Sequence, residues 1–277
     1  MKPNNKNLKN KLLNGLIFLS ILVLIGSLIE NIQRGETQAA YQKLADQRNQ
    51  VQSIDPINEP NQVPLETRKV SSVDPSPPTT DFTATSTRPL LLQPNPNTPL
   101  ISINPDYAGW ISVPGTLIDY PYVQSNDNQE YLTKDFYGKT SKAGSIFMDY
   151  RNIGGISDQN LILYGHNMKN GSMFHDLVKF QEQAFLDKNP FILISDLYRT
   201  RTFKIFSVYE ISADEYTLPV DFPDATAFSA FVEDLANRSM VQVKDPIDQN
   251  VNLVTLITCS YGVGNGRTIV HALEVNP

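Results

Sequence analysis

The sequence predicts a mainly β domain, either a closed barrel or a sandwich, in the part of the chain that follows Leu100. Short runs of β-branched and aromatic residues recur along this part, bounded by Gly, Pro and Asn. Eleven of the fourteen glycines lie between Gly109 and Gly266, and only two helical patterns interrupt the runs. A parallel α/β sheet would need a helix after nearly every strand, so the pattern disfavours it.

The expected strands, in chain order, are Trp110–Val113, Gly144–Met148, Asn160–Tyr164, Phe191–Ile194, Thr202–Tyr209, Val251–Thr258 and Thr268–Val275. A short helix is expected after Ser172, a possible N-cap, with Phe174, Leu177 and Val178 on one side. Asp224 can cap a second helix, whose apolar residues recur at helical spacing: Phe228, Phe231, Val232 and Leu235.

The N-terminal region predicts a membrane anchor. Residues 1–11 carry four lysines and no acidic residue, and residues 12–29 carry no charge. As a helix the second segment would be about 27 Å long, close to the hydrocarbon thickness of a bilayer. The basic tail is expected to stay in the cytoplasm, which places the rest of the chain outside. A cleaved signal peptide is the alternative, but no clear A-x-A site follows Ile29, so an uncleaved anchor is favoured.

Residues 30–98 are expected to link this anchor to a globular domain of residues 99–277. Glu36–Val51 lacks Gly and Pro and is rich in helix formers, which predicts a polar juxtamembrane helix. Ten of the nineteen prolines and no glycine fall in residues 54–99, a composition typical of an extended spacer. We expect neither segment to pack on the domain.

Charge and cysteine content exclude several classes of protein. A net charge of −6 and a pI near 5.1 argue against a nucleic-acid partner. The single Cys cannot form an internal disulfide or a Cys-rich zinc site. The three His show no HExxH or similar spacing, so a metal site is disfavoured, and no cofactor is implied.

Two residues that can do chemistry lie at the ends of predicted strands. Cys259 ends the run Val251–Thr258 and opens into a Gly-rich loop, and His166 follows the run Leu161–Tyr164 through a Gly. A Cys nucleophile needs a base or a cation nearby, because the free thiol is mostly protonated at neutral pH. A buried Cys acting as a small hydrophobe is an equally weighted alternative from this segment alone.

The remaining candidates are Arg267, His175 and His271. If the strands beside the Gly-rich loop form a hairpin, Arg267 lies opposite Cys259 and can stabilise an oxyanion and the thiolate; a surface ion pair is the alternative. His175 lies on its helix away from the apolar side, so we expect it to be exposed. His271 alternates with apolar residues in the last strand and is expected to be a hydrogen-bonded wall residue.

These segments together resemble the sortases, and class B in particular. The resemblance is carried by Thr255–Cys259 (TLITC), by Arg267 eight residues on, and by Leu163–Leu177 (LYGHNMKNGSMFHDL) upstream. Similar segments of the N-terminal half are Asp106–Gln124, Asp127–Gly138 and Gly144–Asn152. The similarity covers nearly the whole globular part, with its motifs in the right order.

The resemblance implies a sortase-type closed β-barrel of about eight strands with added helices. It also implies a cysteine transpeptidase in which Cys259 is the nucleophile, His166 the acid/base partner and Arg267 the contact to the oxyanion and the substrate carbonyl. The implied partners are secreted proteins with a C-terminal sorting signal and an amine acceptor on a cell-wall precursor or a pilin. The implied location is the cell membrane of a Gram-positive bacterium, with the catalytic domain extracellular.

The sequence leaves some alternatives open. Ile257 stands where class B members often have Ser, and Gly262, Gly264 and Gly266 make the loop before Arg267 unusually rich in glycine. Three alternative functions stay open: a pilin-polymerising sortase, a secreted cysteine hydrolase with water as acceptor, and an inactive surface-binding module with a buried Cys. L,D-transpeptidases also pair Cys with His, but close together in sequence, whereas His166 and Cys259 are 93 residues apart.

Overall fold

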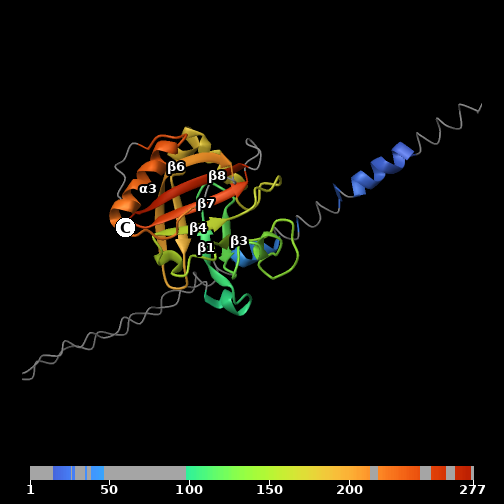
Figure 1. Cartoon of the computed structure of the whole chain (residues 1–277). Coiled ribbons are helices and arrows are strands. Elements are labelled where there is room, and N and C mark those ends of the chain that lie inside the picture. Colours follow the sequence, from blue (N-terminus) through green and yellow to red (C-terminus); the bar gives the residue numbers. More distant parts are fainter. Residues whose placement is uncertain are drawn as a thin grey trace, which may run out of the picture.

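The framework of the described chain is a set of strands: β1 (Tyr107–Ser112), β2 (Asp119–Val123), β3 (Ile146–Met148), β4 (Asn160–Tyr164), β5 (Phe191–Ser195), β6 (Thr200–Ser212), β7 (Leu253–Cys259) and β8 (Gly266–Val275). They close into a barrel in the order β1-β2-β3-β4-β7-β8-β6-β5 (Figure 1). This computed structural model describes residues 15–25, 27–28, 35, 39–46, 98–212, 218–243, 251–259 and 266–275. The predicted fold class is confirmed, and the closed barrel is the form it takes.

Strands β4, β7 and β8 lie side by side and position the candidate site. β4 and β7 are parallel, in register from Asn160 opposite Leu253 to Tyr164 opposite Ile257. β7 and β8 are antiparallel, and their last pair is Cys259 opposite Arg267. Both faces of β4 and β7 are buried, which explains why their sequences are almost continuously apolar rather than alternating.

Strand β2 is absent from the sequence prediction because its sequence, DYPYV, contains a proline. Pro121 lies opposite Trp110 of β1, whereas β3 pairs with β2 only at Tyr122 and Val123. A proline has no N–H to donate, so it is tolerated where the neighbouring strand has not yet begun to pair. The seven predicted strands are all present, with ends that differ by a few residues.

The helices are α2 (Gln183–Lys188), α3 (Ala225–Arg238), η1 (Thr98–Ser102), η2 (Glu130–Leu132), η3 (Gly155–Ser157) and η4 (His175–Gln181). The prediction for α3 is confirmed: the Asp224 carboxylate accepts a hydrogen bond from the Ala227 N–H at 2.8 Å. The predicted cap at Ser172 is wrong. Its hydroxyl instead donates to Asn170 Oδ1 at 2.7 Å, and η4 begins only at His175, after Phe174.

The buried apolar residues form a main cluster and a second, outer cluster. The main cluster is built around buried aromatic residues such as Trp110, Tyr120 and Phe136. The outer cluster lies where α3 packs, and it includes Ile257 and Ile269 of the strands that carry the candidate site. The outer face of β7 and β8 is therefore covered by protein along most of its length.

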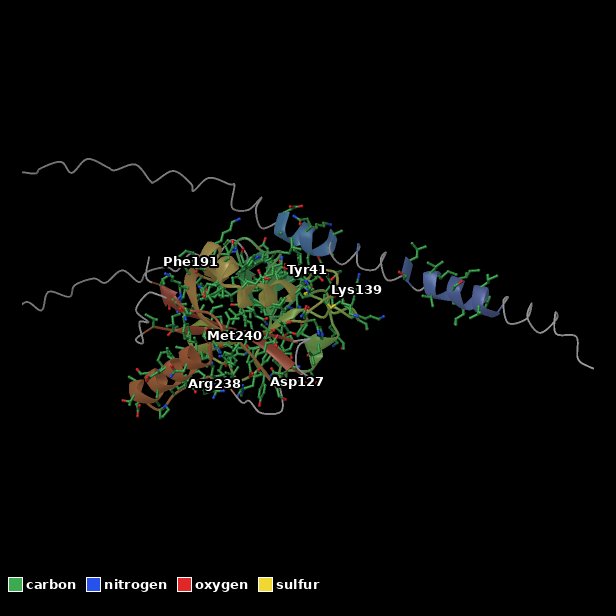
Figure 2. All side chains as sticks on the ribbon, turned by 90° about the horizontal axis from the view of Figure 1, so that it is seen from above. Tyr41, Asp127, Lys139, Phe191, Arg238 and Met240 are labelled. Atoms are coloured by element: carbon green, nitrogen blue, oxygen red, sulfur yellow. The ribbon has the colours of Figure 1, made fainter. Side chains whose placement is uncertain are left out.

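The helical residues 39–46 pack against the barrel, which contradicts the expectation that the juxtamembrane segment stands apart from it. Tyr41, Leu44 and Ala45 are buried and belong to the main core cluster. Figure 2 labels Tyr41 where this helical segment meets the barrel. The rest of the predicted helix Glu36–Val51 lies outside the described residues. The helix was predicted from its composition, but its apolar side was not recognised as a docking face.

Described residues on either side of the Pro-rich segment contact the same part of the barrel. On its N-terminal side, the Tyr41 hydroxyl accepts a hydrogen bond from the Phe136 N–H at 3.4 Å. On its C-terminal side, Asn104 Nδ2 donates to the Phe136 carbonyl at 2.9 Å. Most of residues 54–99 lie outside the described residues. Because the chain is already docked at residues 39–46, before it reaches them, they do not set the distance between the predicted anchor and the barrel.

The predicted anchor, residues 12–29, lies only partly among the described residues. Residues 15–25 and 27–28 are helical, and the large apolar side chains on them are exposed. No helix within the described part of the chain combines the length and the apolar composition needed to cross a membrane.

Candidate functional site

The strand register brings the backbone positions of Cys259, His166 and Arg267 to one edge of the barrel. Tyr164 and Ile257 are paired across the parallel strands β4 and β7, and His166 and Cys259 each follow two residues later. Arg267 lies opposite Cys259 across the antiparallel pair. The N–H of the residue before His166 donates to the Ile257 carbonyl at 3.1 Å, so the alignment continues past the end of β4.

The imidazole of His166 is held from its Nε2 side. Nε2 lies 2.8 Å from the carbonyl oxygen of Leu132, which can only accept a hydrogen bond, so Nε2 carries a proton. In the neutral ring, Nδ1 is then the basic nitrogen. The side chain is half-buried, which limits the number of water molecules that compete for it. This carbonyl therefore fixes both the orientation and the tautomer of the ring.

Gly165 is required by the space available beside His166. A Cβ at this position would lie 2.5 Å from Ile146 Cδ1 and 2.8 Å from Phe174 Cγ. Phe174 also closes the loop after His166, because its N–H donates to the His166 carbonyl at 2.9 Å. The backbone on both sides of the histidine is therefore fixed by the packing of one aromatic ring.

His175 is half-buried, and the expectation that it is exposed is wrong. Its Nδ1 lies 2.7 Å from Asn167 Oδ1, a partner in the loop that follows His166. His271 is fully buried and hydrogen-bonded to Thr255 and Tyr209, so its prediction as a wall residue is confirmed. Neither histidine lines the cavity described next.

Arg267 lines a cavity of about 390 Å³ on the outer side of β4, β7 and β8. Its Nη1 donates to the Gly266 carbonyl at 3.0 Å, and its side chain is half-buried. Apolar side chains from all three strands form the floor of the cavity: Tyr164, Ile257 and Ile269. At position 257, where class B members often have Ser, the Ile257 side chain forms part of the apolar floor of the cavity. The loop positions 262 and 264 lie outside the described residues.

The opposite wall of this cavity is an ion pair between Asp149 and Arg151. The guanidinium donates to the carboxylate twice, at 2.9 and 2.8 Å, and Tyr164 donates to it at 2.9 Å. Burial alone would raise the pKa of Asp149, but the hydrogen bonds from Arg151 and Tyr164 outweigh it and hold this pKa below its usual value. Burial and the neighbouring carboxylate raise the pKa of Tyr164. The wall is thus a fixed charge pair with a neutral phenol beside it.

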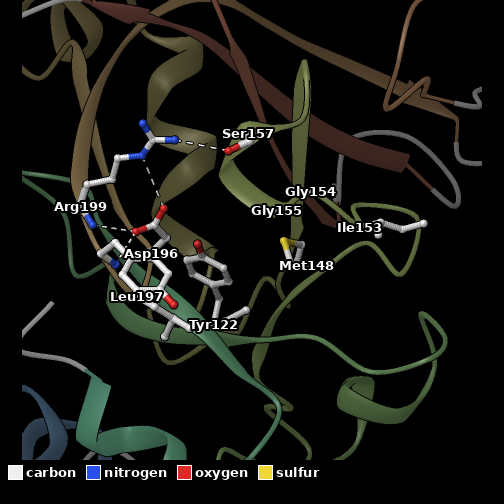
Figure 3. Close-up of a pocket in the computed structure, with 11 residues that line it drawn as sticks. Tyr122, Met148, Ile153, Gly154, Gly155, Ser157, Asp196, Leu197 and Arg199 are labelled. Carbon is white, nitrogen blue, oxygen red and sulfur yellow. Dashed lines mark hydrogen bonds and ion pairs between the residues drawn. The ribbon is translucent and has the colours of Figure 1, made fainter. Parts of the chain in front are cut away.

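A slightly larger cavity, of about 440 Å³, lies elsewhere and contains none of the predicted site residues. Figure 3 shows it between Tyr122, Met148 and the Asp196–Arg199 turn. The Arg199 guanidinium is engaged by Asp196 and by the Ser157 hydroxyl. Within the described residues, no group of three or more His, Cys, Asp or Glu side chains is arranged to hold a metal ion.

Several parts of the site carry no signal in the sequence. The partner of His166 is the backbone carbonyl of Leu132, and a carbonyl is present at every residue. The Asp149–Arg151 pair lies within a segment that had been singled out only for its resemblance. Gly165 was noted as a connector, and its close contact with Phe174 is evident only in three dimensions.

Comparison with known proteins identifies a family that this chain matches. Residues 111–275 match the family model described as the Sortase domain. Sortase B of Listeria monocytogenes is 38% identical over 160 residues, which are 58% of this chain and 65% of that protein, slightly less than two thirds of its length. Sortase B of Staphylococcus aureus is 31% identical over 175 residues, 62% of this chain and 72% of that protein.

Solved structures of other proteins have the same fold as this chain. The X-ray structure of a mutant form of Clostridium perfringens sortase B superposes with a TM-score of 0.63 at 34% identity. The superposition covers 65% of this chain and 87% of that one. The resemblance to class B noted from the TLITC and LYGHN segments is confirmed by these relatives.

Proposed function

Because the chain belongs to the sortase family, we propose that it is a membrane-tethered cysteine transpeptidase with Cys259 as its nucleophile. The observation that carries the proposal is the register: Cys259 lies opposite Arg267 and at the same level as His166. A thiol nucleophile, a proton carrier and a group that contacts the oxyanion must lie close together in such a reaction.

In the first half-reaction, the Cys259 thiolate attacks the carbonyl carbon of a Thr–X bond in a C-terminal sorting signal. Arg267 donates to the oxyanion of the tetrahedral intermediate. The C–N bond then breaks, a thioester remains on Cys259, and the leaving amine takes a proton from Nδ1 of His166. The Leu132 carbonyl supports this step, because it accepts from Nε2 in the imidazolium as well as in the neutral ring.

In the second half-reaction, an amine of a cell-wall precursor attacks the thioester. Its nitrogen forms the new amide bond and loses a proton to His166, while Cys259 leaves as the thiolate. The cavity that Arg267 lines, with its apolar floor and the Asp149–Arg151 pair as a polar wall, supports binding of the sorting signal close to this bond. A pilin amine or water would complete the same cycle, so the acceptor decides between anchoring, polymerisation and hydrolysis.

The membrane tether is proposed from residues 12–29. The uncharged sequence and the exposed apolar side chains of residues 15–25 support insertion into a bilayer. The four lysines before them support a cytoplasmic N-terminus and an extracellular catalytic domain. This placement brings the site close to secreted substrates and to a lipid-linked acceptor on the same membrane face.

The proposal is tested with the full chain in vesicles and a peptide that carries a sorting signal. We expect cleavage without added amine, a new amide product when an amine is added, and neither activity in Cys259→Ala or His166→Ala. Asp234→Ala, on the exposed side of α3, serves as the control for expression and assay. Cleavage that never yields the amide product would instead support a hydrolase, and turnover by Cys259→Ala would remove the assignment.

A further inference from the structure

The docked helical segment of residues 39–46 has one buried and one exposed side. Tyr41 and Leu44 are 4% and 0% exposed, whereas Gln42 and Lys43 are exposed to solvent. A polar linker would have no reason to bury a tyrosine and a leucine on the barrel that it leads to. The contacts of Tyr41 show what this docking holds in place.

The hydroxyl of Tyr41 contacts the segment of residues 131–145, which precedes β3. Its oxygen lies 3.4 Å from the Gly144 carbonyl oxygen and 3.5 Å from Ser145 Oγ, and it accepts from the Phe136 N–H at 3.4 Å. Ser145 Oγ in turn donates to the Lys134 carbonyl at 2.9 Å. Burial raises the pKa of Tyr41 to about 12, so the hydroxyl stays neutral and can donate.

The same segment carries the carbonyl that binds His166. The Ser145 N–H donates to the Tyr131 carbonyl at 3.0 Å, one residue before Leu132. Gly144 packs so closely that an added Cβ would lie 2.8 Å from the Leu132 carbonyl oxygen. The Tyr41 hydroxyl is therefore joined to the Leu132 carbonyl through Ser145 and Gly144.

The ring of Tyr41 reaches His166 by a second route. It packs edge-on against Tyr120, with 5.3 Å between the ring centroids. The Tyr120 hydroxyl accepts from the N–H of Met173, a residue with a positive φ of 57°. Such a conformation is unfavourable for methionine and needs support from its surroundings. The next residue, Phe174, donates its N–H to the His166 carbonyl.

We propose that Tyr41 is a positioning residue for His166, through which the segment next to the membrane anchor holds the imidazole against the Leu132 carbonyl. The proposal rests on the proposed function for its effect on turnover, but not for its effect on the histidine ring. As a consequence, the catalytic geometry depends on residues 39–46. This segment ends 52 residues before the start of η1 and lies outside the residues that match the Sortase domain model.

Measurement of kcat and KM with variants of the full chain separates an effect of Tyr41 on the position of His166 from an effect on folding. In Tyr41→Ala, which loses both routes, we expect kcat per folded molecule to fall by about 10-fold to 10²-fold, as for other small misplacements of a catalytic group. KM should stay unchanged, because Tyr41 does not line the cavity beside Arg267. Tyr41→Phe keeps the ring route and should lose less. Gln42→Ala and Lys43→Ala, on the exposed side of the same helical segment, are the matched controls.

Ser145→Ala covers the case in which Tyr41→Ala does not fold. It removes the Oγ that joins the Tyr41 hydroxyl to the Lys134 carbonyl but leaves the contact of Tyr41 with Gly144. It should therefore lower kcat by no more than Tyr41→Phe does, and the double variant should lose little more than Tyr41→Phe alone. Unchanged kcat in folded Tyr41→Phe and Ser145→Ala, or equal losses in the Gln42 and Lys43 controls, would overturn the proposal.

A spectroscopic readout is independent of turnover. The ¹⁵N signals of the His166 ring should report a protonated Nε2 in the wild type and a mixture of tautomers in the Tyr41 and Ser145 variants. If the wild type transfers no acyl group but the ring signals respond in this way, the proposed function fails and the positioning role stands. If activity is present and the ring signals are identical in all variants, the positioning role is refuted.

Discussion

At the scale of single residues, the site depends on which atoms hold His166 and Arg267. Nε2 of the histidine is held by a backbone carbonyl, and Nδ1 is the nitrogen that we propose to transfer protons. The arginine is half-buried and lines a cavity with apolar and charged walls, and its planar group can donate two N–H bonds to one carbonyl oxygen. Substitutions at the two residues should therefore have different effects on the reaction.

Arg267→Lys separates charge from geometry. Lysine keeps the positive charge but loses the planar fork, so we expect transpeptidation to fall by about 10²–10³, as when an oxyanion-hole donor is removed. Alkylation of Cys259 by a small reagent needs only the thiolate and should change much less. Rates of both reactions in the same preparation provide the measurement. Near-normal transpeptidation would leave Arg267 as an electrostatic neighbour only.

The sequence was sufficient to identify Cys259, His166 and Arg267 as candidates, because strand ends and a hairpin loop are visible as patterns. Their alignment depends on the parallel pairing of β4 with β7, which a sequence pattern does not specify. The Leu132 carbonyl and the contacts of Tyr41 had no signal at all, since a backbone acceptor and a buried tyrosine look ordinary in sequence.

At the scale of elements, local rules succeeded where the local sequence decides the structure. Asp224 caps α3 because its side chain bonds to a nearby N–H of the same helix. Ser172 has the same capacity, but Asn170 takes its hydroxyl. β2 was not predicted because it contains Pro121. Whether a strand tolerates this proline depends on where the neighbouring strand β3 begins to pair, which the sequence of β2 does not show.

The helical segment of residues 39–46 gives a prediction at this scale. Removal of residues 1–98 would expose the core around Tyr41 and Leu44, and burial of each large apolar side chain contributes about 1.5–3 kcal/mol. We therefore expect this truncation to lower the urea midpoint. Removal of residues 51–94 alone keeps the docked segment and should leave the midpoint close to that of the full chain.

Equilibrium unfolding of the full chain, the truncation and the internal deletion provides the comparison. A truncation as stable as the full chain would mean that the docking contributes no free energy of unfolding. A large loss in the internal deletion would mean that the Pro-rich segment itself packs on the barrel.

At the scale of the whole molecule, His271 joins four strands into one hydrogen-bonded unit. Thr255 donates to Asn160 and accepts from Nδ1 of His271, while the Tyr209 hydroxyl donates to Nε2. These residues come from β7, β4, β8 and β6, and the bond that Nε2 accepts from Tyr209 requires a neutral ring. Complete burial lowers the pKa of His271 to about 3, against an ordinary value of 6.5.

The sign of the pH dependence follows from this shift. Between pH 6.5 and about 3 the unfolded chain binds a proton at His271 that the folded chain does not, so the free energy of unfolding falls as the pH is lowered. The slope contributed by one such group is at most about 1.4 kcal/mol per pH unit. Above pH 6.5 the group contributes no slope.

Urea unfolding of the wild type and of His271→Gln at pH 7, 6, 5 and 4 tests this expectation. The variant should be less stable at pH 7, because the network is disturbed, but its stability should decline less steeply between pH 6 and 4. Parallel curves would show that His271 does not carry the acid sensitivity and that other groups, such as Asp149, dominate it.

The proposed reaction requires a thioester on Cys259 during acyl transfer, and mass spectrometry of the protein detects such an adduct. The full chain is mixed with a sorting-signal peptide, quenched in acid and digested to locate the added mass. We expect an adduct on Cys259 with the mass of the peptide fragment that ends at threonine. The adduct should be lost when an amine is supplied, and the matching amide product should form. An adduct on another residue, or peptide turnover without any adduct on Cys259 under these conditions, would contradict it.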